Sequence, residues 1–263
     1  MDNISTMSKQ QLNEVKIILT DIDDTLTTDG RLKSNAYSAL ENLSNSGFIV
    51  IPVTVRCAGW CDHIASMWPV NGVVGENGSF FFSYDHQSKK MQQTYCQTPK
   101  ERKENHLALH EIKKTILKNV SGSALASDQD YRHTDLAIDF AEDVAPLSSN
   151  KIKEIVRIAE NAGAIAKVSS IHVNCWIGSH NKLSTSLTTL DQVFGVSNSN
   201  IQNEVLFIGD SPNDSMMFDY FNKSVGVANV MDFIKELDKP PKYITLNHSG
   251  EGFVELADSL LRR

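Results

Sequence analysis

The segment Ile18-Leu19-Thr20-Asp21-Ile22-Asp23-Asp24-Thr25-Leu26-Thr27 carries the pattern from which the fold of this 263-residue chain can be predicted. The run Val15–Thr20 is short, apolar and β-branched, which is typical of a strand buried on both faces of a parallel sheet. Three carboxylates follow within four positions. Carboxylates this close repel one another unless a cation balances them. The segment therefore predicts a buried strand that ends at a cation site.

The residues after this segment alternate between helical and strand patterns. Residues 34–47 predict a helix with Ser34 as its N-cap and Gly47 as its stop signal. Phe48–Thr54 predicts a second buried strand, although Pro52 is unfavourable in a central strand. Strand, helix and strand form a βαβ unit with a right-handed crossover.

The same alternation returns after Lys182. We expect helices at 183–194, 211–220 and 252–261, with strands at 205–208, 224–229 and 242–246. Alternating strands and helices predict a doubly wound, Rossmann-like parallel sheet, which is an α/β fold.

The middle of the chain has a different pattern. Residues 83–97 resemble an antiparallel ribbon, and helices are expected at 103–120 and 150–162. Residues 135–140 alternate polar and apolar side chains, as in a half-exposed strand. We therefore predict an inserted α+β cap domain at residues 84–180, and a core made of residues 1–83 and 181–263.

Composition limits the possible partners. A formal charge of −7 argues against general binding to nucleic acid or to an anionic membrane. The first fifteen residues lack the apolar region of a signal peptide, and no window contains eighteen apolar residues.

The four cysteines, Cys57, Cys61, Cys96 and Cys175, form no CxxC pair and suit a reducing compartment. We expect a cytoplasmic protein that is a monomer or a small homo-oligomer.

Carboxylates follow two of the predicted strands. Asp21 and Asp23 come after the first strand, and Asp210 and Asp214 come after the strand at 205–208. Ligands of open parallel sheets bind beyond the carboxyl ends of the strands, so these four side chains are expected at one edge. An acidic all-oxygen site favours Mg²⁺. Calcium is the weaker alternative, because no loop resembles an EF-hand.

Four motifs in order resemble the haloacid dehalogenase superfamily. Asp21-x-Asp23-Asp24-Thr25-Leu26 is similar to its first motif, Thr54-Val55-Arg56 to its second, Lys182 to its third, and Gly209-Asp210-x-x-Asn213-Asp214 to its fourth. The long interval between the second and third motifs resembles the Cof-like, type IIB branch, which includes sucrose-phosphate and mannosyl-phosphoglycerate phosphatases. Residues 75–78, 226–229 and 243–253 also resemble that branch.

The resemblance implies roles for the matching residues. Asp21 would attack phosphorus as the nucleophile, and Asp23 would act as general acid and base. Mg²⁺ would be held by Asp21, the Asp23 carbonyl, Asp210 and, through water, Asp214. The residues expected to bind phosphoryl oxygens are Thr54, Lys182, Arg56 and Asn213.

Several of these residues have a second interpretation. Val55 stands where the family usually has Gly, which leaves the placement of Arg56 open. Asn213 suits a helix N-cap as well as a ligand, and Asn77-Gly78 suits a hairpin turn as well as a site. Asp24 is expected to be structural. Lys182 lies at a predicted helix start, an unfavourable place for a cation unless it has a function.

The cap of this family selects the substrate, so polar faces of cap strands are of interest. In residues 170–177, Ser170, His172, Asn174 and Trp176 alternate with apolar side chains and share one face. This face suits a sugar or polyol ring, and it also suits a solvent-facing strand. Arg132 could bind a second anionic group or form a surface salt bridge.

The resemblance implies an Mg²⁺-dependent hydrolase of a small phosphomonoester, such as a sugar phosphate, acting through an aspartyl-phosphate on Asp21. A phosphomannomutase-like phosphotransferase has a similar core and cap and is the first alternative. A non-catalytic protein that binds a phosphorylated ligand is the second, although such a protein needs no nucleophile.

Overall fold

The computed structural model describes residues 1–169 and 171–262, which divide into two compact units. The first unit contains residues 1–55, 61–94 and those from 181 onward, and the second contains 56–60 and 95–180. The sequence predicted a cap at 84–180. The hairpin of β5 (Phe80–Asp85) and β6 (Lys90–Tyr95) accounts for the difference, because it joins β4 (Val73–Gly75) of the first unit in one sheet.

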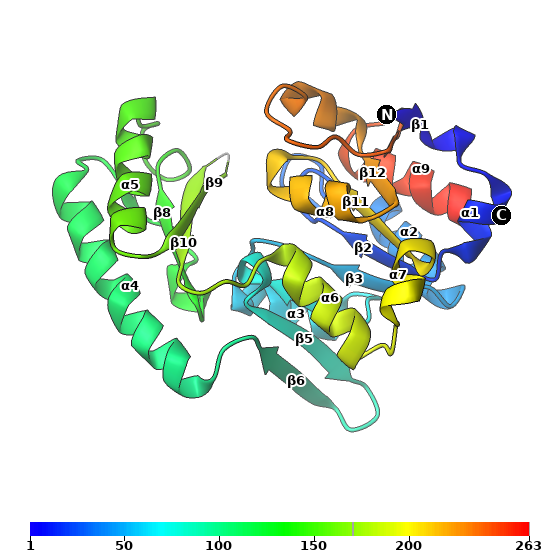
Figure 1. Ribbon diagram of the computed structural model, residues 1–263, viewed down its shortest axis with the longest axis horizontal. Helices are drawn as coiled ribbons and strands as arrows, with labels where there is room; N and C mark the ends of the chain where they lie inside the picture. The colour runs from blue at the N-terminus through cyan, green and yellow to red at the C-terminus, as the bar shows by residue number, and fades with distance from the viewer. Residues whose placement is uncertain (170, 263) are drawn as a thin grey trace. The chain divides into compact units, whose positions relative to one another are not determined.

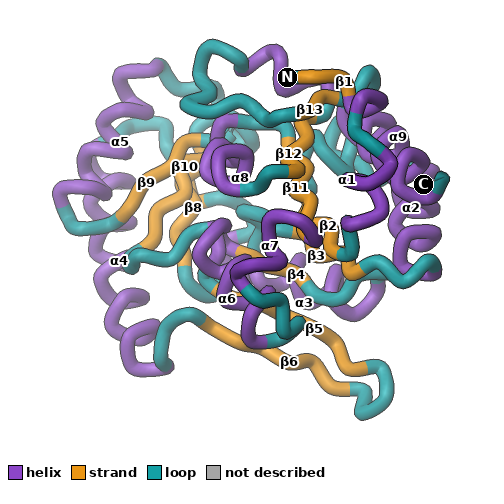
Figure 2. Tube along the Cα trace, turned by 45° about the vertical axis from the view of Figure 1, so that its right-hand side comes forward, coloured by secondary structure: helices purple, strands orange, loops and turns teal. Residues whose placement is uncertain are grey.

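A six-stranded parallel sheet forms the centre of the first unit (Figure 2). Its order is β1 (Asp2–Asn3), β13 (Tyr243–Ile244), β12 (Lys223–Gly226), β11 (Val205–Gly209), β2 (Ile17–Thr20) and β3 (Ile49–Pro52). A bridge between Val53 and Val74 continues the sheet to β4. The predicted α/β fold with a parallel sheet is confirmed.

Helices cover both faces of this sheet (Figure 1). On one side α2 (Ser34–Asn45) and α9 (Ser249–Leu261) pack on each other beside α1 (Lys9–Glu14). On the other side lie α6 (Lys182–Gln192), α7 (Asn198–Glu204) and α8 (Ser215–Tyr220), and there Leu19 and Phe207 join the core with Phe218. Burial on both faces explains why these strands are continuously apolar.

Two local details differ from the sequence prediction. Helix α2 begins at Ser34 and its N-cap is Lys33, so Ser34 is not the cap. The short helices α1 and α7 were not predicted, because each has fewer than eight residues and too few turns to show a periodicity.

Pro52 lies in β3 without disrupting the sheet. The backbone N–H of Val53 donates to Thr20 of β2, whereas the N–H groups of Val50 and Thr54 point the other way, to Asn71 and Val74. Position 52 therefore directs its nitrogen away from β2. Because the missing N–H of Pro52 would face away from β2, its absence removes no hydrogen bond between β2 and β3.

The second unit is an antiparallel sheet with two helices. The strand order is β7 (Ala124–Leu125), β8 (Asp135–Asp139), β10 (His172–Trp176) and β9 (Ile165–Val168). Helices α4 (Pro99–Asn119) and α5 (Ser149–Asn161) cover the face that carries Val173 and Cys175. Helix α4 starts earlier than predicted, because Thr98 and Glu101 form a capping box around Pro99.

Strand β8 is buried along its whole length, so the prediction of a half-exposed strand is wrong. Asp135 accepts two hydrogen bonds from Arg132, at 3.0 Å each. Asp139 accepts from the backbone N–H groups of three residues that follow it, Ala141, Glu142 and Asp143. An alternating pattern identifies two faces of a strand, but it does not reveal that the polar face is covered.

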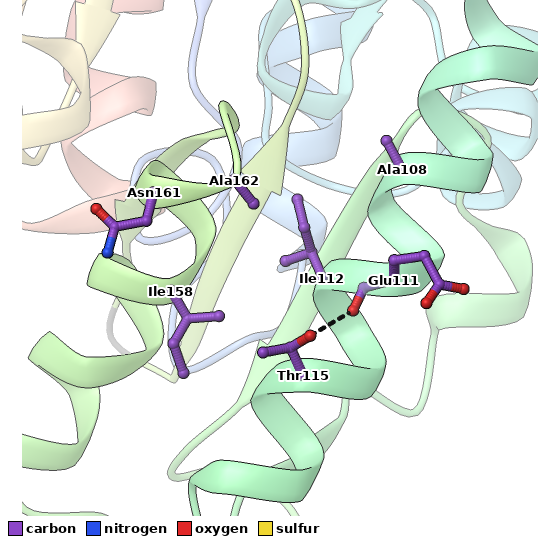
Figure 3. A pocket seen from close by; sticks show the side chains of 7 residues that line it. All are labelled: Ala108, Glu111, Ile112, Thr115, Ile158, Asn161 and Ala162. Atoms are coloured by element: carbon purple, nitrogen blue, oxygen red, sulfur yellow. Dashed lines mark hydrogen bonds between the residues drawn. The ribbon is translucent and has the colours of Figure 1, made fainter.

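Helices α4 and α5 enclose a groove of about 480 Å³ on the second unit (Figure 3). Ala108, Ile112 and Ile158 are among the residues that line it. None of the predicted site residues contributes to the groove. Within the described residues, no helix is both long and apolar enough to cross a membrane.

Arg132 is a buried cation that connects two carboxylates of the second unit. Its guanidinium donates to both oxygens of Asp128 and both oxygens of Asp135, and its side chain is 3 % exposed. We expect Arg132→Met to lower the free energy of unfolding by about 3–5 kcal/mol, because it removes the cation that balances the buried carboxylate of Asp135. Arg157→Met, which breaks an exposed pair with Glu154, is the matched control and should change little. Urea unfolding followed by circular dichroism measures both variants, and equal losses would contradict this assignment.

Candidate active site

The carboxyl ends of neighbouring parallel strands bring the predicted motifs together in the first unit. Asp21 follows β2, and its backbone N–H continues the ladder by donating to Ile208 of β11 at 2.9 Å. Asp210 follows β11 directly, and Thr54 follows β3. The predicted edge of the sheet is therefore the place where these side chains lie.

The loop after Asp21 winds around one carbonyl group. The Ile22 oxygen accepts from the backbone N–H groups of Thr25, Leu26 and Thr27. Asp24 is exposed and has a φ of 53°, a left-handed conformation that Asp tolerates better than most residues. Asp24 thus has the features of a turn residue.

Lys182 lies at the centre of the site. Its ammonium group donates to Asp21 Oδ1 at 2.8 Å, to Asn213 Oδ1 at 2.9 Å and to Asp214 Oδ1 at 2.8 Å. It is the first residue of α6, where the helix dipole disfavours a cation. Two buried carboxylates compensate for that placement.

The carboxylates of Asp21, Asp210 and Asp214 gather beside the lysine. One oxygen from each lies within 4.8 Å of the others, and all three residues are buried. The second oxygen of Asp214 accepts from the Asp210 backbone N–H at 3.2 Å. Asp23, half-buried, lies two residues along the chain from Asp21.

Burial and mutual repulsion alter the titration of these groups. Burial raises the pKa of Asp21, and the charges of Asp214 and Asp23 add to the increase while Lys182 opposes it. Burial also raises the pKa of Asp210, with further contributions from Asp21 and Asp214. For Lys182, burial alone would lower the pKa, but Asp21 and Asp214 reverse this and raise it.

The charge balance of the cluster fits a divalent cation. Three carboxylates face a single ammonium group, which leaves a formal charge of minus two when all are ionised. Closely spaced buried carboxylates with raised pKa values are the arrangement that a bound cation relieves. Asp21, Asp210 and Asp214 could hold it with oxygen ligands, as Mg²⁺ prefers.

The structure excludes the N-cap alternative for Asn213 and describes the backbone at Val55. Asn213 is not an N-cap, since Ser211 precedes the 3₁₀ turn Pro212–Asp214 and the Asn213 oxygen binds Lys182. Val55 is not among the described residues with positive φ. A valine therefore meets no left-handed strain at the position where the family usually has Gly.

Thr54 and Arg56 fall in different units. Thr54 is fully buried, and its backbone N–H donates to Val74 at 2.8 Å. Arg56 belongs to the second unit, where its guanidinium carbon lies 5.2 Å from the centre of the Trp60 ring. This distance permits a cation–π contact.

Two residues of the site lie in segments that resemble the family but were given no role from the sequence. Asn229 donates from its amide to Asp210 Oδ2 at 3.2 Å and to the Asp24 carbonyl at 3.1 Å. The Thr25 hydroxyl lies 3.5 Å from Asp210 Oδ1. Asn229 follows strand β12, so the rule that placed the carboxylates at strand ends could also have identified it.

Three of the predicted cap residues lie on the face of β10 opposite α4 and α5. His172, Asn174 and Trp176 are all buried, and Ser170 lies outside the described residues. The Trp176 indole N–H donates to the His180 carbonyl at 3.2 Å. His172 Nε2 lies 2.9 Å from Glu142 Oε2 without the alignment of a hydrogen bond, and Asn174 Oδ1 has no partner.

The fold resembles several solved structures. The Thermoplasma acidophilum 0175 protein has a TM-score of 0.72 and 17% identity, with 94% of this chain and 98% of that one covered. A haloacid dehalogenase-like hydrolase from Bacteroides thetaiotaomicron has a TM-score of 0.67 and 18% identity, with coverage of 94% and 99%. The C-terminal domain of C. albicans trehalose-6-phosphate phosphatase has a TM-score of 0.68 and 15% identity, with coverage of 96% for each chain.

At such identities these likenesses concern the fold. A comparison with curated protein sequences found no match. The model of the haloacid dehalogenase-like hydrolases matches residues 18–255, a span that begins at the first predicted strand and ends within α9. The chain therefore belongs to the haloacid dehalogenase-like hydrolase family.

Proposed function

We propose that the protein is a Mg²⁺-dependent phosphatase that hydrolyses a small phosphorylated metabolite through an aspartyl-phosphate on Asp21. One observation carries the proposal. Asp21 is held 2.8 Å from the Lys182 ammonium group in a buried cluster with Asp210 and Asp214. A carboxylate fixed beside a cation, at the edge where ligands of parallel sheets bind, suits attack on an anionic phosphoryl group.

The chain supplies the groups that the reaction needs. An Asp21 oxygen attacks phosphorus, and the ester P–O bond breaks as Asp23 gives its proton to the leaving oxygen. Asp23 then takes a proton from water, the water oxygen attacks phosphorus, and the P–O bond to Asp21 breaks. Phosphate leaves and both carboxyl groups return to their starting states. Lys182 and Thr54 bind the phosphoryl oxygens, and for this the ammonium group of Lys182 exchanges one of its three present hydrogen bonds for one to phosphate.

We assign the cation ligands to Asp21, Asp210, the Asp23 carbonyl and, through water, Asp214. Bound Mg²⁺ would supply charge neutralisation at the phosphoryl group. Asn229 and Thr25 contact Asp210, and we infer that they orient this ligand.

The substrate class rests on the polar face of β10. Asn174 Oδ1 is a buried acceptor with no partner, so a donor such as a sugar hydroxyl would satisfy it. The name of one structural neighbour, a trehalose-6-phosphate phosphatase, also supports a sugar phosphate. Arg132 already binds two carboxylates, so we assign it to the stability of the second unit.

Replacement of the nucleophile tests the reaction. We expect Asp21→Asn to lower kcat for phosphate release at least about a thousandfold, because the amide is a poor nucleophile. Asp24→Asn is the matched control. It changes the adjacent exposed carboxylate to a residue that also tolerates positive φ, and it should keep most of the activity.

The assay measures free phosphate from a panel of sugar phosphates, polyol phosphates and a small aryl phosphate, with Mg²⁺ and with EDTA. Phosphate release that survives Asp21→Asn would refute the role of Asp21. Isomerised sugar phosphate without free phosphate would identify a mutase. Binding of phosphate esters without turnover would identify a non-catalytic binder.

Metal removal should expose the raised pKa values of the acidic cluster. The unfolded state releases its Asp protons near the ordinary value of 3.8, while folded Asp21 and Asp210 keep theirs to higher pH. Between these values the folded state holds more protons, so the free energy of unfolding of the metal-free protein falls as pH rises. We expect Mg²⁺ to raise the melting temperature more at pH 8 than at pH 5.

Thermal unfolding with EDTA or with Mg²⁺ across this pH range measures the effect. Asp210→Asn removes one ligand and should reduce the Mg²⁺-dependent increase. An increase that is independent of pH, or equal in Asp210→Asn, would contradict this assignment of the cation site.

Substitutions in the second unit test the substrate class. We expect Asn174→Ala and His172→Ala to lower kcat/KM for the preferred sugar or polyol phosphate about tenfold, with less effect on a small aryl phosphate, because only the former offers hydroxyl groups. Asn161→Ala, at the end of α5, is the control and should change neither. Equal losses on all substrates would count against a specificity role.

A further inference from the structure

The loop between β4 and β5 has an unusual backbone. Glu76, Asn77 and Gly78 have φ values of 43°, 56° and 94°, three consecutive residues in the left-handed region. Only Gly adopts this region freely, and Glu is not one of the residues enriched there. Glu76 is fully buried and Asn77 is 7 % exposed, so strained residues lie inside the first unit. Strain of this kind persists only where surrounding contacts enforce it, and it is common at functional sites.

Two segments hold the loop in place. On one side the Asn77 backbone N–H donates to the Thr54 carbonyl at 3.3 Å. On the other side the Thr185 hydroxyl of α6 donates to the Gly78 carbonyl. A Cβ on Gly78 would overlap the Asn181 carbonyl, which shows how closely the loop approaches the start of α6. The loop thus lies between the segments that carry Thr54 and Lys182.

The side chain of Asn77 is not explained by the turn. Its amide nitrogen is buried and makes no hydrogen bond in the structure. A buried amide donor without a partner is rare, because its loss of water is not compensated. Gly would adopt the same backbone without that cost. An acceptor bound between the Thr54 and Lys182 segments would satisfy this amide.

We propose that Asn77 is a further substrate-binding residue, whose side-chain amide donates a hydrogen bond to a phosphoryl oxygen of the bound phosphomonoester. The inference rests on the proposed function, because Thr54 and Lys182 are its phosphate-binding residues. A phosphoryl oxygen is an acceptor and meets the need of the unpaired donor. A cation does not, since an amide N–H has no lone pair to offer.

Binding of inorganic phosphate in the presence of Mg²⁺, measured by isothermal titration calorimetry, tests the inference. Asn77→Gly keeps the left-handed backbone and removes only the side chain. We expect its affinity for phosphate to fall about tenfold, the effect of one hydrogen bond. Asn77→Asp keeps the shape but replaces the donor with a charged acceptor, so its affinity should fall further. Melting temperatures near that of the wild type show that both variants fold.

Two control variants calibrate the measurement. Lys89→Gly replaces a residue with a φ of 55° in the exposed β5–β6 turn and should leave phosphate affinity unchanged. Thr54→Val removes a hydroxyl already assigned to phosphate and should weaken binding. Asn77→Gly with wild-type phosphate affinity, beside a weakened Thr54→Val, would overturn the inference and leave the proposed function intact.

The remaining outcomes separate the inference from the proposed function. A change in KM for esters without a change in phosphate affinity would place Asn77 at the leaving group and overturn the assignment to a phosphoryl oxygen. A wild-type protein that binds phosphate but hydrolyses no ester refutes the proposed function alone, and the affinity of Asn77→Gly then decides the inference. A wild-type protein that binds no phosphate refutes the inference, and the release of phosphate from esters then decides the proposed function.

Discussion

The ion cluster around Lys182 is the interaction on which the first unit depends. One ammonium group binds side chains that follow β2 and β11, which are separated by nearly two hundred residues of sequence. The cluster is buried. If the lysine were removed, water could not replace its hydrogen bonds to the carboxylates. The cluster also has more negative than positive charge. A further cation would balance this excess, and its binding would couple the stability of the sheet edge to the ligand.

The strands that carry this site can be predicted from two physical rules whose effects are visible in the sequence. Strands buried on both faces must be apolar along their whole length, and this makes β2, β3 and β11 recognisable. Parallel strands end at a common edge, and this rule alone predicts that Asp21 and Asp210 lie together. Pro52 is ambiguous in the sequence, because the direction of a single N–H group cannot be read from it.

Other features depend on contacts that no local pattern encodes. The burial of Asp135 and Asp139 follows from Arg132 and from a turn of backbone N–H groups, both of which cover the polar face of β8. The role of Asn229 depends on how β12 lies beside β11, because the amide of Asn229 is brought to Asp210 only by that pairing. The assignment of Lys182 rests on resemblance, since a cation at a helix start is otherwise unfavourable.

Two unpaired amide atoms, one in each unit, differ in chemical sense, and this difference bears on the proposed substrate. In the first unit the unpaired atom is a donor, the amide nitrogen of Asn77, and a phosphoryl oxygen can accept from it. In the second unit Asn174 Oδ1 is an acceptor. A fully ionised phosphate has no proton to donate to it, whereas a hydroxyl group does. The roles proposed for Asn77 and Asn174 are therefore chemically distinct, since phosphate satisfies only the first and a hydroxyl donor, as in a sugar or polyol, satisfies the second.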